Sequence, residues 1–292
     1  MRWFNSAIHL FFLKTITLPA AALQFIRKAP TPLVLVPTMG ALHEGHLALI
    51  RHARKLAGKS GRVVVTIFVN PAQFGPKEDF SKYPRPLATD RKLCRENGVD
   101  LLFTPSANDL YGPYYSTWVD EITLSDSLCG KSRPGHFKGV CTVVAKLFNL
   151  IRPDMAVFGM KDFQQLAIIQ RMVRDLNFPV KIIAVETVRE PDGLALSSRN
   201  RFLLPEERIQ ASVIRQSLLQ AGKLVKSGET NVIAVKRSIL RQISKAPLAV
   251  IDYLEIVDLE TLRPVTLIRK NNLIAIAVFF GKTRLIDNLL LS

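Results

Sequence analysis

Short apolar runs alternate with segments of helical periodicity over the first two-thirds of the chain. Five runs have the length and the β-branched content of buried strands, and the segments between them repeat apolar residues every three or four positions. Strands are predicted at residues 33–36, 62–69, 101–103, 155–158 and 180–185, and helices at 46–56, 87–97, 139–150 and 163–176. This alternation predicts an α/β fold with a Rossmann-like, doubly wound parallel sheet.

The pattern changes after Arg201. Residues 205–227 and 231–244 have helical periodicity, whereas 248–258 and 273–280 read as strands around a polar turn at 260–264. Helices followed by a strand pair predict a smaller C-terminal α+β domain. We therefore expect a first domain at residues 1–190 and a second at 191–292, with the turn at 191–193 near the hinge.

Two histidines lie where the first predicted strand gives way to a helix. The apolar run ends at Val36, the chain turns through Met39 and Gly40, and His43 and His46 precede the helical positions. Unpaired N–H groups at a helix N-terminus attract phosphate, and two imidazoles there add hydrogen-bond donors for its oxygens. The alternative is a loop with two incidental histidines. The chain has only 5 histidines, which favours the phosphate site.

Polar residues follow the other predicted strands in the same way. Asn70 and Gln73 come after the second strand, and Lys161 and Asp162 come after the fourth. Ligands of open parallel sheets bind at the carboxyl ends of the strands. We therefore expect these side chains to meet the histidine segment at one edge of the sheet.

Composition places the chain among globular proteins without a membrane span. Hydrophobic residues make up 48% and charged residues 22% of the 292 residues, and no apolar run reaches 18 residues. The 3 cysteines lack metal-ligand spacing and predict reduced thiols in a cytoplasmic protein. Residues 1–14 resemble a signal peptide only weakly, because charged and polar residues interrupt a short apolar core. We interpret them as a lineage-specific extension or a misplaced start.

The formal net charge of +16 has two interpretations. A basic surface attracts anionic small molecules by electrostatic steering, or it binds nucleic acid. The excess of basic residues is spread over the whole chain, without a run of five or an aromatic-interleaved basic stretch. This dispersion favours anionic substrates, with no nucleic-acid or membrane partner.

Five segments together resemble one enzyme family. Residues 36–46 resemble the HIGH-type nucleotidyltransferase signature, a superfamily that also contains class I aminoacyl-tRNA synthetases. In order and spacing, residues 67–74, 132–137, 158–165 and 192–200 complete a resemblance to the pantothenate synthetase (pantoate–β-alanine ligase) family. It extends from about Leu18 to Asn288.

The resemblance implies an ATP-dependent ligase that condenses (R)-pantoate with β-alanine. Pantoate would attack the α-phosphorus of ATP to give pantoyl adenylate and pyrophosphate, and the β-alanine amine would displace AMP to give pantothenate. Mg²⁺ would accompany ATP, and the enzyme would be a homodimer, with residues 119–124 as a candidate interface. Two alternatives remain open: another HIGH-family adenylyltransferase acting on a different acid, and a basic nucleic-acid-binding protein of synthetase-like fold.

The resemblance also assigns roles to single residues. His43, His46 and Lys161 would be catalytic, with His46 as the proton donor to the phosphates. Gln73 would bind pantoate and β-alanine, Gln165 would bind pantoate, and Met39 and Asn70 would complete the substrate site. Asp162 is a candidate metal ligand, and Asp90 is a weaker one, otherwise a solvated helix residue. The residues expected to bind ATP are Met39, Gly40, Ala41, Leu42, His43, Glu44, Gly45, His46, Gly159, Met160, Lys161, Asp162, Val188, Leu196, Ser197, Ser198 and Arg199.

Arg133 and His136 flank a Pro-Gly loop within the segment 132–137. They would close over the site from the same or a neighbouring subunit, or serve only to shape the loop.

Overall fold

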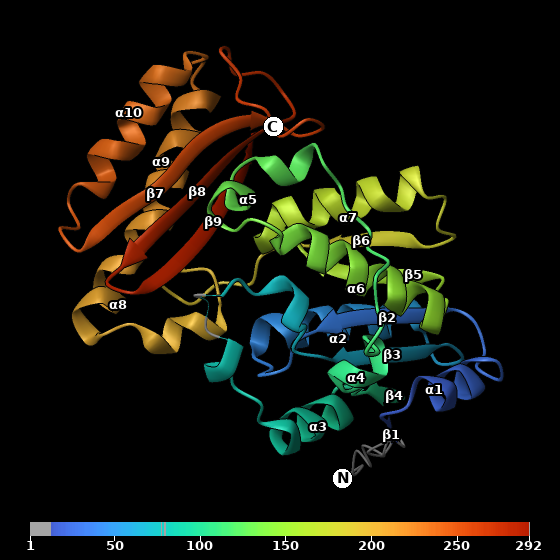
Figure 1. Cartoon of the computed structure of the whole chain (residues 1–292). Helices are drawn as coiled ribbons and strands as arrows, with labels where there is room; N and C mark the ends of the chain where they lie inside the picture. The colour runs from blue at the N-terminus through green and yellow to red at the C-terminus, as the bar shows by residue number, and fades with distance from the viewer. Residues whose placement is uncertain (1–12, 77, 79, 292) are drawn as a thin grey trace, which may run out of the picture.

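A computed structural model describes residues 13–76, 78 and 80–291, which form two β-sheets with helices packed around them (Figure 1). The first sheet has six parallel strands in the order β1-β4-β3-β2-β5-β6. Its strands are β1 (Lys14–Ile16), β2 (Leu33–Thr38), β3 (Arg62–Ile67), β4 (Leu101–Phe103), β5 (Met155–Gly159) and β6 (Lys181–Val185). The five predicted strands are therefore confirmed, and β1 is an addition to them.

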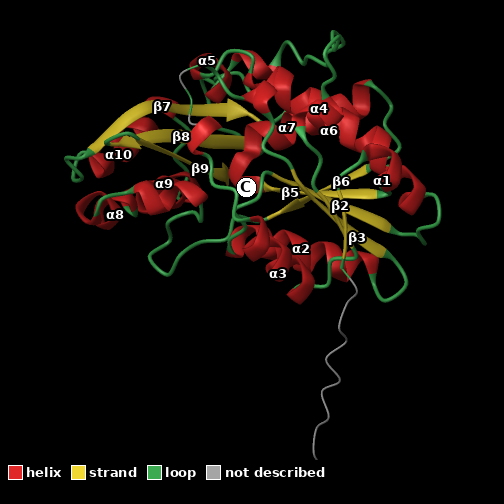
Figure 2. Ribbon diagram, turned by 60° about the horizontal axis from the view of Figure 1, so that its bottom comes forward, coloured by secondary structure: helices red, strands yellow, loops and turns green. Residues whose placement is uncertain are grey.

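Helices cover both faces of this sheet (Figure 2). One face packs against α2 (Glu44–Ala57) and α3 (Leu87–Glu96), and the other against α1 (Pro19–Ile26), α6 (His136–Ile151) and α7 (Phe163–Asp175). Successive residues of β2 point to opposite faces: Val34 and Val36 belong to the first core, and Leu33 and Leu35 to the second. The doubly wound fold is therefore confirmed. Strand order reverses between β2 and β5, the position where such sheets bind ligands.

The predicted extension at residues 1–14 ends too late. Lys14 is the first residue of β1, pairs with Leu101, and donates its backbone N–H to the carbonyl of Asp100 at 2.9 Å. Leu13 is buried in the same core as Val34. Lys14 belongs to the sheet and Leu13 to the core beside it, and residues 1–12 lie outside the described part of the chain.

The second sheet has three antiparallel strands in the order β7-β8-β9. They are β7 (Ala249–Asp258), β8 (Asn272–Phe280) and β9 (Thr283–Leu291). The strand pair β7–β8 was predicted, and β9 was not. One face packs against α8 (Pro205–Ala211), α9 (Val213–Lys226) and α10 (Val232–Ile243). The predicted single helix at 205–227 is wrong, because the chain breaks at Ser212 into α8 and α9.

The other face of the second sheet packs against the first part of the chain. Alternate residues of β8 separate the two cores: Ile274 and Ile276 pack with the helices α9 and α10, whereas Leu273 and Ala275 join the core that contains α6 and α7. The boundary at residue 190 remains a prediction. At that point the chain makes a tight turn, in which Gly193 has a φ of +90° and donates its N–H to Glu190.

Shorter helices complete the chain. They are α4 (Ala107–Leu110), α5 (Cys129–Ser132) and the 3-10 helices η1 (Pro71–Gln73), η2 (Phe80–Lys82), η3 (Leu124–Asp126), η4 (Met160–Asp162) and η5 (Ser198–Phe202). Among residues 13–76, 78 and 80–291, no helix has both the length and the hydrophobicity needed to cross a membrane.

Candidate active site

A cavity of about 260 Å³ lies at the carboxyl ends of β2, β3 and β5. Residues from all the predicted segments line it, although they are far apart in the sequence. From the predicted site they are Met39, His43, Gly45, His46, Asn70, Gln73, Gly159, Lys161, Asp162, Gln165, Val188, Leu196, Ser197, Ser198 and Arg199. The expected convergence of these segments at one sheet edge is therefore present.

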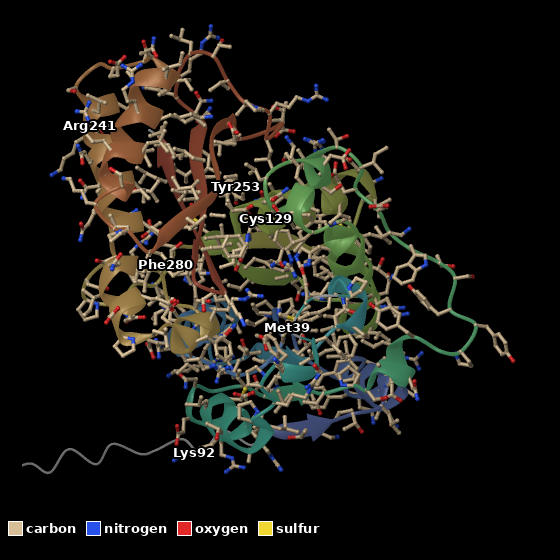
Figure 3. The ribbon with its side chains drawn as sticks, turned by 60° about the vertical axis from the view of Figure 1, so that its left-hand side comes forward. Met39, Lys92, Cys129, Arg241, Tyr253 and Phe280 are labelled. Atoms are coloured by element: carbon tan, nitrogen blue, oxygen red, sulfur yellow. The ribbon has the colours of Figure 1, made fainter. Side chains whose placement is uncertain are left out.

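A larger cavity of about 680 Å³ lies next to it, between the first part of the chain and the second sheet. Lys161, Gln165 and Arg199 line both cavities, so the two are neighbours. Cys129 of α5 and Tyr253 of β7 face each other across the wall of the larger one, with their sulfur and phenol oxygen 3.3 Å apart (Figure 3). The second sheet thus forms one side of the space above the first sheet.

Five residues of the predicted ATP site line neither cavity. Ala41 and Leu42 are buried in the turn after β2, Glu44 pairs with Arg51 at the surface, and Met160 packs against the core. Gly40 has a φ of +80°, which favours glycine, and a Cβ there would lie 2.8 Å from a side-chain carbon of Ile67. Gly40, Ala41, Leu42 and Glu44 belong to the segment between β2 and the start of α2, and Met160 belongs to η4; their role in ATP binding remains a prediction.

Asp90 fixes the same turn from α3. It is 1% exposed, and its two carboxylate oxygens accept the backbone N–H groups of Ala41 and Leu42, each at 2.8 Å. The prediction of a solvated helix residue is therefore wrong. The placement does not support a metal ligand either, because both oxygens face backbone donors in the protein interior.

The two histidines form a capping box at the start of α2. His43 Nδ1 accepts the N–H of Gly45 at 3.1 Å, and His46 Nδ1 accepts the N–H of His43 at 3.3 Å. A neutral imidazole whose Nδ1 accepts a hydrogen bond carries its proton on Nε2. Burial and the neighbouring His43 lower the pKa of His46 to about 3, and burial and Lys161 lower the pKa of His43. Both rings are therefore neutral donors at pH 7.

Gln73 is oriented by Asn70. The Asn70 amide nitrogen donates to Gln73 Oε1 at 3.1 Å and to the carbonyl of Gly139 at 3.0 Å, and its oxygen accepts the hydroxyl of Tyr111 at 2.9 Å. Asn70 is 1% exposed and its side-chain polar atoms bond within the protein; its predicted part in the substrate site remains a prediction. The Gln73 amide nitrogen lies 3.2 Å from Met39 Sδ, at the cavity wall.

Arg133 and His136 hold Gln73 from the other side. His136 Nδ1 lies 2.8 Å from the carbonyl oxygen of Gln73 and donates to it, so its Nε2 accepts from Arg133 at 2.9 Å. Arg133 also donates to both carboxylate oxygens of Glu78, at 2.6 and 2.7 Å. Burial and the charge of Arg133 lower the pKa of His136 to about 4. The loop therefore contacts Gln73 within the same chain, and closure over the site remains a prediction.

Lys161 and Gln165 follow β5. The Lys161 side chain is 19% exposed, and its nitrogen lies 3.9 Å from the half-exposed carboxylate of Asp162. Gln164 is buried and bonds the backbone of Leu124, Ser127 and Cys129. Of the two adjacent glutamines, only Gln165 lines the smaller cavity.

The segments around Val188 and Ser197 lie side by side. The N–H of Leu196 donates to the carbonyl of Val188 at 3.0 Å. Ser197 caps η5, because its hydroxyl accepts the N–H of Arg199 at 3.2 Å. This pairing brings backbone, hydroxyl and guanidinium groups to one wall of the smaller cavity.

Within the described residues, no three His, Cys, Asp or Glu side chains are grouped as a metal site. Asp162 is the carboxylate of the predicted site that borders both cavities.

Comparison with known proteins decides the family. Residues 12–290 match the family model described as pantoate-beta-alanine ligase. The chain belongs to this family. The "Pantothenate synthetase" of Thermotoga neapolitana is 52% identical over 266 residues, which cover 91% of this chain and 94% of that protein. The family's activity, condensation of pantoate with β-alanine, is therefore the activity of this chain.

Solved structures of the family have the same fold. The pantothenate synthetase of Thermus thermophilus superimposes with a TM-score of 0.89 at 45% identity, covering 94% of this chain and 98% of that one. The pantoate-beta-alanine ligase of Francisella tularensis, complexed with beta-gamma ATP and β-alanine, gives a TM-score of 0.78 at 33% identity, covering 95% and 97%. The fold and the ligase activity expected from the sequence are thus confirmed. The alternatives, a different acid and a nucleic-acid-binding protein, are not favoured.

Proposed function

We propose that this ligase works through a pantoyl-adenylate intermediate. The carboxylate of pantoate attacks the α-phosphorus of ATP and pyrophosphate leaves; the amine of β-alanine then attacks the acyl carbon and AMP leaves. A carboxylate needs this activation, because hydroxide is a poor leaving group. The convergence of neutral histidines, a lysine, an arginine and two glutamines on one cavity supports the proposal most directly.

ATP lies along the wall of the smaller cavity that is formed by Met39, His43, Gly45, His46, Val188 and residues 196–199. The Nε2–H groups of His43 and His46 donate to phosphate oxygens, and His46 strengthens its bond as charge builds on the leaving pyrophosphate. Lys161 and Arg199 supply positive charge, and Ser197 and Ser198 supply hydroxyl donors. Donors fixed in place before the reaction stabilise such charge most effectively.

Pantoate lies in the smaller cavity beside Gln73 and Gln165. The amides of these side chains offer both donors and acceptors to the hydroxyl and carboxylate groups of pantoate. Apolar side chains of the same cavity, including Val143, Val144 and Phe158, suit its two methyl groups. Gln73 also receives β-alanine, in keeping with the β-alanine complex of the Francisella tularensis relative.

Asp162 would help to hold a Mg²⁺ ion bound together with ATP. Magnesium is bound by one or two carboxylates together with phosphate oxygens, and Asp162 beside Lys161 offers one such carboxylate. When bound, the ion neutralises part of the phosphate charge.

The enzyme acts in the cytoplasm as a homodimer. Each chain has two domains with a boundary at about residue 190. ATP supply and the free cysteines Cys94, Cys129 and Cys141 support this location. Ile122, in the predicted interface 119–124, is 75% exposed in the single chain, which supports its burial by a second copy.

Single-turnover formation of pantoyl adenylate without β-alanine tests the residue assignments. His46→Ala and Lys161→Ala should each slow this step by a factor of about 10² to 10³, the usual loss for one pre-organised charge-stabilising group. Gln73→Ala should instead raise the KM for pantoate. The increase corresponds to a loss of about 1–3 kcal/mol in the free energy of pantoate binding. His52→Ala, on the same helix as His46 and outside both cavities, is the matched control.

Normal adenylate formation by His46→Ala, with only the later reaction with β-alanine impaired, would overturn the assignment of His46 to phosphoryl chemistry.

A further inference from the structure

Asn288, on the last strand of the second sheet, contacts the loop that carries Lys161. Its amide nitrogen donates to two successive backbone carbonyls, that of Met160 at 2.9 Å and that of Lys161 at 3.0 Å. One side chain from β9 therefore holds both peptide units of η4 next to the Lys161 Cα. No sequence motif marked this residue for such a role.

Asn288 is itself held in place by its neighbour Asp287. Asp287 is 4% exposed, accepts the backbone N–H of Asn288 at 2.8 Å, and pairs with Arg189 through both oxygens, at 2.7 and 2.9 Å. Arg189 directly follows Val188 and also donates to the carbonyl of Gly193. The pair Asp287–Asn288 thus ties β9 to the segment after β6 as well as to η4.

The position of a lysine ammonium depends on the backbone from which it extends. Lys161 has a flexible side chain with four methylene groups, so a small rotation of its peptide units displaces the nitrogen by a larger amount. Misplacement of a catalytic group by about 1 Å costs on the order of 10²-fold in rate. A partly buried amide whose nitrogen donates to two successive backbone carbonyls is suited to prevent such displacement.

We propose that Asn288 is a positioning residue for Lys161 and makes the orientation of the second sheet part of the catalytic apparatus. The proposal rests on the role of Lys161 in adenylate formation proposed above. Asn288 acts only through the η4 backbone. Asn288 and Lys161 both border the larger cavity, so a displacement of β9 relative to β5 changes both the cavity wall and the direction of the ammonium group.

The test is the rate of adenylate formation in Asn288→Ala and Asn288→Asp. Alanine removes the donor, and aspartate keeps its size while replacing the donor with an acceptor that repels the two carbonyls. Each should lower the rate by about 10- to 10²-fold, with the KM for pantoate little changed. Asn272→Ala is the matched control, because Asn272 on β8 accepts the N–H of Arg269 in the connection before β8, away from η4.

A double variant separates positioning from a general loss of stability. If Asn288 acts through Lys161, Lys161→Ala/Asn288→Ala should be no slower than Lys161→Ala alone. Thermal unfolding of each variant verifies that it is folded at the assay temperature. Multiplicative losses in the double variant, or an Asn288→Ala rate equal to that of Asn272→Ala, would overturn the proposal.

The proposed role of Lys161 and that of Asn288 are contradicted by different results. If Lys161→Ala keeps the parental rate, the proposed role of Lys161 is wrong. If Lys161→Ala is slow and the Asn288 variants are not, only the positioning role is wrong.

Discussion

The two sheets of this ligase contribute to the site in different ways. In the parallel sheet, β2, β3 and β5 each end at the same edge and are followed by a short loop with one or two polar side chains that line the cavity. The antiparallel sheet contributes polar side chains mainly through Asp287 and Asn288 of β9, because β8 is buried along almost its whole length. Parallel topology collects residues that are distant in sequence, whereas the antiparallel sheet supplies a wall and an anchor.

The two sheets also differ in the interactions that stabilise them and their loops. Around the parallel sheet, buried polar side chains fix the functional loops. Asp90 holds the backbone of the turn after β2, and Gln164 holds η3 and α5. Asn70 bonds the side chain of Gln73, and His136 bonds its carbonyl. The antiparallel sheet is stabilised mainly by apolar packing on both faces. Substitutions should therefore affect the two sheets through different mechanisms.

The largest expected effect tests whether the sheets are separate folding units. Leu273→Ala and Ile274→Ala remove adjacent buried side chains that face different cores, and each should lower the free energy of unfolding by about 2–5 kcal/mol. Because β8 belongs to both cores, both variants should shift one common transition. The chain has 2 tryptophans, so Trp3→Phe leaves Trp118 as the single fluorescent tryptophan. Its fluorescence follows unfolding of the first part of the chain, and circular dichroism follows the secondary structure of the whole chain.

The exposed Ile233 provides a control, since Ile233→Ala on α10 should change stability little. If Ile274→Ala shifted only the circular dichroism signal and not the Trp118 fluorescence, the second sheet would unfold independently.

A smaller loss is expected at Asp90, where a buried carboxylate fixes the loop after β2. Asp90→Ala leaves two buried N–H groups unpaired and should cost about 2–4 kcal/mol of stability. Asp90→Asn keeps one acceptor and should lose roughly half as much. Chemical denaturation measures both, and an unchanged midpoint in Asp90→Ala would show that water replaces the carboxylate.

Asp90 also illustrates what the sequence cannot reveal. Its place in the first turn of a predicted helix is typical of a solvated acidic residue, and its burial depends on a contact 49 positions away in sequence. The motif histidines were predictable because their spacing fits a local strand–turn–helix. Partners that meet only after folding, such as Asn288 and the Lys161 loop, leave no local pattern.

The missed strand β9 has a similar cause. Its buried positions include Thr283 and Asp287, which interrupt the alternation of apolar residues that predicts a strand. Asp287 is tolerated there because Arg189 neutralises it. In contrast, β2, β3 and β5 are almost purely apolar, and their predicted positions differ from the observed ones by at most two residues at each end.

Low pH should lower the free energy of unfolding through two buried histidines next to the parallel sheet. Burial lowers the pKa of His46 to about 3 and that of His136 to about 4, from the usual 6.5. Below pH 6.5 the unfolded chain binds protons that the folded protein does not, so the free energy of unfolding falls as the pH decreases. The expected loss is about 1.4 kcal/mol per pH unit for each histidine, or about 2 kcal/mol each at pH 5. Above pH 6.5 these groups should contribute no pH dependence.

His46→Asn is the informative control for this effect. Its side-chain oxygen takes the place of Nδ1 as acceptor for the His43 N–H, but it does not titrate. Urea denaturation at pH 7 and pH 5 should therefore show a smaller loss in His46→Asn than in the parent protein. Equal losses in the two proteins would mean that His46 titrates normally in the folded state.

The smallest expected effect concerns the edge strand β1. Removing residues 1–12 should leave both stability and activity unchanged, since the family match begins at residue 12. Removing residues 1–14 also deletes Leu13, whose burial contributes about 1.5–3 kcal/mol, and the hydrogen bond from Lys14 to Asp100. The second truncation should still fold and catalyse, because β1 lies at the edge of the sheet farthest from β2 and β5. Denaturant midpoints compare the stability of the two truncated proteins, and equal midpoints would mean that Leu13 and Lys14 do not stabilise the sheet. Loss of activity on removal of residues 1–12 would show that these residues have a function.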